Sequence, residues 1–254
     1  MFEPISINDL ILFQSALFHS CEEINHGFST RIGGVSSGFF HSLNLGLIKG
    51  DSRRKVIVNR RRFFNAIRIP AERTVQGIQV HGDRIRIVTE PGTYPGTDGL
   101  ITTQKELVLL IKTADCPAVL LVDPQQRVVA AVHAGWRSVV KGILEKVIQL
   151  LNDQFNSRSA NILCAVGPVI RSCCYEVRED VWNIFPEDVI VRRDDKCFLD
   201  LPLAIRQKLL GQGIIENHLD DSGLCTSCRA DLFFSHRRDC GQTGRMMAAI
   251  YLRQ

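Results

Sequence analysis

Three short apolar runs in the middle of the chain constrain its fold more than any other feature of the sequence. Residues 107–111, 118–122 and 128–132 are each continuously apolar, and the turn residues Asp123 and Pro124 separate the last two runs. Apolar runs of this length, without alternation, fit strands that are buried on both faces. The sequence therefore predicts a buried β-sheet at the centre of the molecule.

Helical segments are expected around this sheet. The strongest pattern spans residues 138–155, where apolar residues recur at the spacing of one buried helix face. A second helix is expected over 51–67, with Asp51 or Ser52 as its cap. Shorter helices are expected over 179–184 and 203–210, and further strands over 74–80, 84–89, 162–166 and 246–252. Strands and helices mix without strict alternation, which predicts the α+β class with a mixed sheet.

Length and composition indicate one ordinary folded domain. The 254 residues contain 45% hydrophobic and 23% charged residues, and neither a repeat nor a linker is visible. A single domain over 1–254 is therefore expected. The net charge of +4 comes from scattered basic residues with short clusters at 53–55 and 60–62. These clusters are interpreted as solvated helix faces, so no nucleic-acid partner is expected.

The first residues and the short apolar runs indicate neither a secretory signal nor a membrane span. Residues 1–12 contain Glu3 and Asp9 and lack the basic start of a secretory signal. The apolar runs are far shorter than the roughly 20 residues that span a bilayer. We therefore expect a cytoplasmic protein with no membrane partner.

The chain has nine cysteines, which in a reducing cytosol indicate buried thiols and metal-binding or catalytic cysteines. Cys225 and Cys228 could bind zinc with His236 and Cys240 downstream, although free thiols are the simpler interpretation. The neighbours Cys173 and Cys174 are expected to be packing residues, because a vicinal pair does not easily chelate one metal ion.

Three further residues indicate a catalytic metal site. His81, Cys116 and His133 each lie where an apolar strand is expected to end and a turn to begin. Two imidazoles and one thiolate suit zinc, and three protein ligands leave a fourth position for water or substrate. His133 also precedes the expected long helix, whose N-terminus would favour a phosphate. Asp115 could accept a hydrogen bond from a ligand histidine.

The same residues allow other interpretations. Cys116 could be the nucleophile of a cysteine hydrolase or amidase, with His133 or His81 as its base. Copper-dependent phenol oxidation is disfavoured, because multicopper oxidases use repeated His-x-His pairs and this chain has seven histidines and no such pair. A binding or scaffold protein without catalysis is a third alternative.

Ordered motifs along nearly the whole chain resemble the YfiH-like family, which is also labelled laccase-domain or polyphenol oxidase. The motifs lie at residues 30–36, 42–46, 79–82, 97–100, 113–117, 133–137 and 233–239. The resemblance implies β-sheets packed together and flanked by helices in an αββα-like arrangement. It also implies a zinc ion ligated by His81, Cys116 and His133.

For function, the resemblance implies a purine nucleoside phosphorylase acting on adenosine, inosine, guanosine and methylthioadenosine, with adenosine deaminase activity. Purine nucleosides and phosphate are then the expected partners of a monomer or homodimer. Relatives have also been linked to editing of cell-wall precursors, which fits the hydrolase alternative.

Three polar residues are candidates for substrate binding. Arg31 and Arg137 could bind phosphate, since guanidinium groups make strong paired contacts with it. Asn44 could hydrogen-bond the sugar or the base. Many relatives have glycine after the Gly-Trp-Arg motif where this chain has Ser138, which leaves the shape of the following helix start open.

Overall fold

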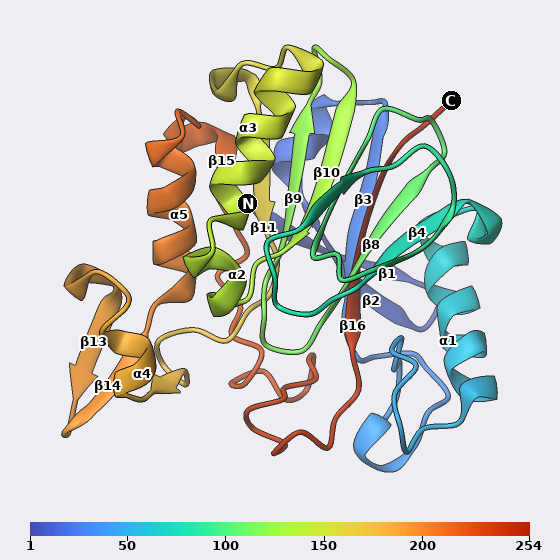
Figure 1. The fold of residues 1–254 in the computed structure, drawn as a ribbon. Helices are drawn as coiled ribbons and strands as arrows, with labels where there is room; N and C mark the ends of the chain where they lie inside the picture. The colour runs from blue at the N-terminus through green and yellow to red at the C-terminus, as the bar shows by residue number, and fades with distance from the viewer.

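The computed structural model describes residues 1–254 as two stacked β-sheets with helices on their outer sides (Figure 1). The first sheet has seven strands in the order β1 (Phe2–Ile7), β2 (Leu10–Ser15), β3 (Ile24–Ser29), β16 (Met246–Leu252), β8 (Val108–Thr113), β4 (Thr74–Ile78) and β6 (Gly92–Pro95). Strand β4 runs parallel to β8 and β6, and the other pairs are antiparallel. This first sheet is therefore mixed.

The second sheet has six strands in the order β15 (Leu219–Asp221), β11 (Leu163–Val166), β9 (Ala118–Asp123), β10 (Val128–His133), β7 (Gly99–Thr102) and β5 (Ile85–Ile87). Its outer pairs, β11 with β15 and β5 with β7, are parallel. A separate small sheet contains β12 (Glu176–Val177), β14 (Lys196–Leu199) and β13 (Ile190–Arg193) beside the four-residue helix α4 (Glu179–Trp182).

Three apolar clusters join the layers. Helix α1 (Arg53–Ala66) packs Phe63 against the outer face of the first sheet. The space between the sheets is filled by residues such as Phe28 and Leu120. Helices α3 (Ile143–Phe155) and α5 (Leu201–Gly211) cover the outer face of the second sheet. The α+β class with packed mixed sheets and flanking helices is thus confirmed.

The continuous apolar runs are explained by these layers. In β9, Leu120 belongs to the cluster between the sheets, whereas its neighbour Leu121 packs on the helical side. Successive side chains of a strand point to opposite faces, and here both faces are covered. The strands predicted over 107–111, 118–122 and 128–132 are confirmed as β8, β9 and β10.

The single helix predicted over 138–155 is wrong. Helix α2 (Trp136–Val140) ends after five residues, and α3 begins at Ile143. Gly142 lies between them with φ of +81°, a left-handed conformation that an α-helix cannot contain. The apolar spacing continues across this break, because Val139 and Ile143 are both buried in the same cluster, so periodicity alone did not reveal it.

The helix predicted over 51–67 is α1, and Ser52 is its capping position, although its side chain makes no capping hydrogen bond. Asp51 instead accepts hydrogen bonds from Ser36 Oγ and Asn44 Nδ2. None of the helices is long and apolar enough to cross a lipid bilayer.

Buried His26 makes the fold sensitive to acid. Its Nε2 accepts a hydrogen bond of 2.8 Å from the Ser15 backbone N–H. Burial, followed by the nearby charges of His19 and Arg253, lowers the pKa of His26 from 6.5 to about 3. Below pH 6.5 the unfolded chain therefore binds a proton that the folded chain excludes, and stability falls as the pH decreases through this window.

We expect wild type to lose about 2 kcal/mol more unfolding free energy than His26→Gln between pH 7.5 and pH 5. Glutamine keeps an acceptor but does not titrate in this range. Urea unfolding of both chelator-treated proteins at the two pH values measures the difference. Equal losses in the two proteins would contradict a neutral His26.

Candidate metal centre

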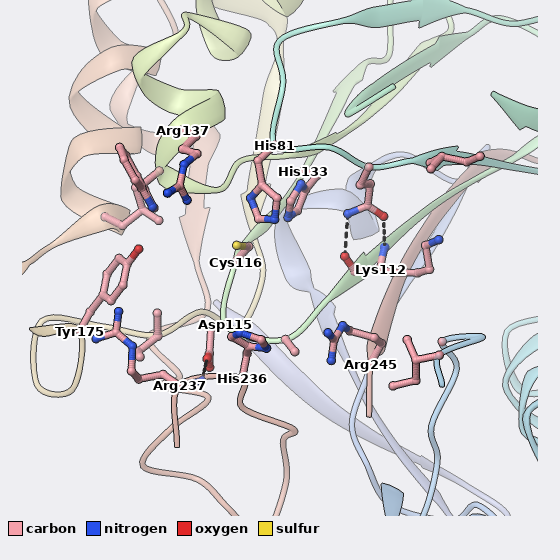
Figure 2. A pocket seen from close by; sticks show the side chains of 18 of the residues that line it. His81, Lys112, Asp115, Cys116, His133, Arg137, Tyr175, His236, Arg237 and Arg245 are labelled. Atoms are coloured by element: carbon pink, nitrogen blue, oxygen red, sulfur yellow. Dashed lines mark hydrogen bonds between the residues drawn. The ribbon is translucent and has the colours of Figure 1, made fainter. Parts of the chain in front are cut away.

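The three predicted ligands converge at one rim of the sheets. His81 lies just after β4, Cys116 just before β9, and His133 is the last residue of β10. Strands β9 and β10 pair His133 with Ala118, which places Cys116 beside it. One ligand atom from each residue lies within 4.8 Å of the others, and Figure 2 shows the sulfur beneath the two imidazoles.

Asp98 orients both histidines. Nδ1 of His133 donates to Asp98 Oδ1 at 2.8 Å, which leaves Nε2 as the free ligand nitrogen. The same carboxylate accepts from the backbone N–H groups of Val80, His81 and Gly82 at 3.1, 3.0 and 2.8 Å. One fully buried carboxylate therefore fixes the ring of His133 and the turn that carries His81.

The expectation that Asp115 accepts from a ligand histidine is wrong. Asp115 Oδ1 accepts from Thr226 Oγ1, and its Oδ2 accepts from the Arg237 backbone N–H, both at 2.6 Å. Asp115 therefore ties the loop of Cys116 to the C-terminal loops. The role of Asp98 was missed because its contacts with His81 and His133 span 17 and 35 positions, and no local sequence pattern records them.

The residues present fit a metal ion. His81 Nδ1 is buried and has no hydrogen-bond partner. A buried polar atom without a partner is unfavourable, and a cation bound at this nitrogen would remove that cost. A Cβ atom at Gly135 would lie 2.9 Å from that nitrogen and 3.0 Å from Cys116 Sγ, so only glycine leaves room beside the ligands. Two nitrogens and one sulfur form a donor set for a borderline transition metal.

The ligands are electrostatically coupled. Burial raises the pKa of the Cys116 thiol, but His133 and His81 outweigh burial and lower it to about 6. Burial lowers the pKa of His133, whereas Cys116 and Asp98 outweigh it and raise that pKa to about 9. Without a metal ion, Cys116 and His133 therefore form a thiolate–imidazolium pair at neutral pH. The thiolate is the form that binds metals and also the form that attacks electrophiles.

The ligands line a pocket of about 520 Å³. Four cationic side chains share its lining, namely those of Lys112, Arg137, Arg237 and Arg245. None of them forms a salt bridge with a carboxylate. Such a concentration of unpaired positive charge in a cleft attracts anionic ligands. Figure 2 shows these cations on both sides of the ligands.

Only one of the three predicted substrate-binding residues lines the pocket. Arg137 does so, with its guanidinium carbon 4.2 Å from the Trp136 ring centroid. Arg31 lies outside the lining, and its Nε donates to the His41 carbonyl at 2.7 Å. Asn44 is fully buried, and its Oδ1 accepts from the Arg245 backbone N–H at 2.9 Å. Asn44 thus positions Arg245.

Several lining residues were not predicted from the sequence. They are Lys112, Tyr175, His236, Arg237 and Arg245. Three of them come from the long segment between β15 and β16, which contains the motif at 233–239. The helix after His133 is the five-residue α2 rather than the long helix expected, and its first residues Trp136 and Arg137 line the pocket. Four cationic side chains make the pocket basic.

The fold and the pocket define an αββα protein with a group of possible metal ligands at the strand ends and a basic cleft around them. Residues 25–253 match the family described as multi-copper polyphenol oxidoreductase laccase, and the chain belongs to this family. The resemblance of the sequence to the YfiH-like, laccase-domain family is thereby confirmed.

Curated relatives of this chain carry the name purine nucleoside phosphorylase. One, YlmD of Geobacillus stearothermophilus, is 39% identical over 246 residues, which cover 90% of each chain. A relative from Deinococcus radiodurans is 40% identical, covering 90% of this chain and 89% of its own length. YfiH of Escherichia coli is 36% identical, with 88% and 92% covered.

Solved structures show the same fold. The crystal structure of YlmD from Geobacillus stearothermophilus superposes with a TM-score of 0.92 at 35% identity, covering 98% of both chains. The structure titled Bacillus licheniformis hypothetical protein YfiH also gives 0.92, at 33% identity and 99% coverage of both chains. The two-sheet arrangement is thus that of its relatives over the whole length.

Proposed function

We propose that this protein is a zinc-dependent purine nucleoside phosphorylase that cleaves adenosine, inosine, guanosine and methylthioadenosine and also deaminates adenosine. The relatives named purine nucleoside phosphorylase support the nucleoside and phosphate part of this proposal. The observation that carries it is the pocket itself, in which the ligands His81, Cys116 and His133 lie beside four unpaired cations.

Zinc is the proposed occupant of the triad. Two imidazole nitrogens and one thiolate match the ligand preferences of zinc. The family description names copper, but this chain has none of the repeated His-x-His pairs that multicopper oxidases use. A zinc ion held by His81, Cys116 and His133 would polarise a substrate oxygen or activate water. Asp98 holds the His133 ring in the tautomer that presents Nε2.

In phosphorolysis a phosphate oxygen attacks C1′ of the ribose while the bond from C1′ to the purine nitrogen breaks. Positive charge develops on the ribose and negative charge on the departing base, while the phosphate brings its own negative charge into the pocket. Arg137, Arg245 and Lys112 line the pocket, and in this proposal they hold the phosphate by charge-assisted hydrogen bonds. Tyr175 lines the pocket, and its phenol, whose pKa is about 10 in water and is raised further by burial, is protonated at neutral pH and can hydrogen-bond the departing purine.

Product analysis tests this proposal. Metal-analysed protein is incubated with adenosine, inosine or methylthioadenosine, with and without phosphate. We expect the free base and the ribose 1-phosphate product only when phosphate is present. Inosine should form from adenosine in either condition. Absence of base release from every nucleoside would contradict the phosphorylase assignment.

The Arg137→Gln variant tests the phosphate contact. This guanidinium stacks on Trp136 and forms no hydrogen bond within the protein, so its loss should leave the fold intact. We expect KM for phosphate to rise at least about tenfold, the usual effect of removing a charged hydrogen-bond partner. The metal content should stay the same. Arg54→Gln, on an exposed part of α1, is the matched control. An unchanged KM for phosphate would exclude Arg137 from the phosphate site.

A cysteine hydrolase or amidase acting on cell-wall precursors is the second candidate. The thiolate–imidazolium pair of Cys116 and His133 favours it, because that pair is also how cysteine nucleophiles are activated. The two candidates differ in their response to metal removal. A hydrolase should keep its turnover after chelation and lose it on alkylation of Cys116, whereas the phosphorylase should lose turnover on chelation and regain it with zinc.

A further inference from the structure

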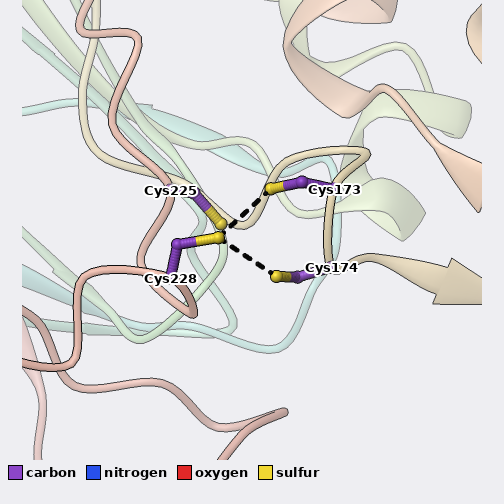
Figure 3. A group of neighbouring side chains, drawn as sticks. All are labelled: Cys173, Cys174, Cys225 and Cys228. Carbon is purple, nitrogen blue, oxygen red and sulfur yellow. Dashed lines mark hydrogen bonds between the residues drawn. The ribbon is translucent and has the colours of Figure 1, made fainter.

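A second group of possible metal ligands lies in the loops beside the pocket. The sulfur atoms of Cys173, Cys174, Cys225 and Cys228 all lie within 4.8 Å of one another. Figure 3 shows the sulfurs of the first two cysteines directed towards those of the other pair. The expectation that Cys173 and Cys174 are packing residues is therefore wrong, since Cys173 is exposed and Cys174 is half-buried.

The sequence also suggested the wrong partners for Cys225 and Cys228. His236 lines the pocket, and Cys240 is an exposed free thiol outside the cluster. The two pairs of cysteines are about fifty residues apart in the chain, and no spacing rule for short zinc motifs connects them.

The backbone brings the two pairs together. Strands β11 and β15 are neighbouring and parallel, so the loops that follow them leave the same edge of the sheet. Val169 in the first loop pairs with Cys225 in the second. Its N–H donates to the Leu224 carbonyl, and its carbonyl accepts from the Thr226 N–H, both at 3.1 Å. The position of the four sulfurs is thus set by main-chain pairing.

The distances suit a tetrahedral ion. Zinc binds thiolate sulfur at about 2.3 Å, which separates the four sulfurs of a tetrahedral site by about 3.8 Å. Cys228 Sγ lies 3.4 Å from Cys173 Sγ and 3.3 Å from Cys174 Sγ. A disulfide requires sulfurs about 2.05 Å apart, much closer than these pairs. Shifts of well under 1 Å would complete a four-sulfur site.

We propose that Cys173, Cys174, Cys225 and Cys228 form a second metal site, a closed tetrathiolate that binds one Zn²⁺ and clamps two pocket-lining loops together. All four positions around this ion are filled by protein, as in structural zinc sites, so it has no open position for a substrate. The proposal does not depend on phosphorolysis, because its evidence is the cysteine cluster alone.

The clamp would stabilise one wall of the pocket. Tyr175 directly follows Cys174 and lines the pocket. Thr226 directly follows Cys225 and donates through Oγ1 to Asp115, next to the ligand Cys116. The Arg193 guanidinium donates to the carbonyl of Ser172, the residue before Cys173, and so brings a positive charge to the first loop. Loss of the ion should therefore loosen the side of the pocket that Tyr175 lines, while His81, Cys116 and His133 stay together.

Metal analysis of the full-length protein, purified under reducing conditions, tests this proposal. We expect two zinc ions per chain in wild type and one in Cys228→Ser, in which an exposed sulfur is replaced. Cys116→Ala should also contain one ion, and the double variant none. Cys240→Ser, at an exposed cysteine outside the cluster, is the matched control and should keep two. The same zinc content in Cys228→Ser and in wild type would overturn the proposal.

Two further measurements test the metal site without relying on the folding of Cys228→Ser. Co²⁺ added to metal-free wild type should produce the charge-transfer absorption of a tetrathiolate site, and Cys116→Ala should retain this signal. Chelation should lower the melting temperature of Cys116→Ala by about 5 °C or more, because binding to such sites contributes to folding. A cobalt spectrum without a tetrathiolate component, or a disulfide found within the cluster in freshly reduced protein, would contradict the metal site. Failure of the phosphorylase proposal would change none of these results.

Discussion

Replacing Cys116 with alanine should remove the metal ion from the pocket and reduce phosphorolysis by about a thousandfold or more. The proposed site has only three protein ligands, and Cys116 would supply its one negatively charged donor. Two imidazoles alone hold zinc weakly, and without the ion the pocket loses the group that polarises the substrate. Metal content and turnover should therefore fall together.

Metal analysis and phosphate-dependent base release from inosine measure this effect in the same preparation. Cys21→Ser is the matched control, because Cys21 is a half-buried free thiol just before β3 and lies outside both groups of possible metal ligands. It should retain metal and turnover. Full turnover in a Cys116→Ala protein that lacks the pocket metal would exclude the proposed mechanism.

Replacing Asp98 with asparagine should weaken zinc binding by about 10- to 100-fold, the usual effect of losing the acceptor behind a ligand histidine. Both oxygens of this buried carboxylate accept hydrogen bonds, from His133 Nδ1 and from three successive backbone N–H groups around His81. Asparagine offers one oxygen, and its amide group would face donors at the other position. The ring of His133 and the turn of His81 would both shift.

Competition with a chromophoric zinc chelator measures this change in affinity. Asp153→Asn, on the exposed side of α3, is the matched control and should bind zinc as wild type does. The Asp115→Asn variant distinguishes the role of Asp115 from that of Asp98. It should disturb the loop of Arg237 with much less effect on zinc affinity, since Asp115 contacts no ligand histidine. A larger loss of affinity in Asp115→Asn than in Asp98→Asn would contradict the assigned role of Asp98.

The central layers of the fold could be predicted because burial leaves a direct pattern in the sequence. Strands β8, β9 and β10 have no solvent-facing side, so their apolar runs identify them. The break at Gly142 could not be predicted in this way, since the apolar residues before and after it face the same core. Strand β6 is short and largely exposed, and β12 has only two residues, so neither strand carries such a signal.

The ligand triad could be proposed from the sequence because each ligand follows or precedes a recognisable strand. The side chains around it were harder to find, since they depend on contacts between distant segments. Asp98 reaches His133 across 35 positions, and Asp115 reaches Arg237 across 122. Arg31 and Asn44 have residue types suited to substrate binding, but their hydrogen bonds hold loops together. Motif membership alone did not distinguish these roles.

A crystal structure of the purified protein, with anomalous data collected at the zinc absorption edge, tests the central claim most directly. We predict a zinc peak about 2.0–2.3 Å from Cys116 Sγ, His133 Nε2 and one ring nitrogen of His81, with a water or substrate atom as the fourth ligand. Crystals of active protein with no metal peak among these three side chains would contradict the account.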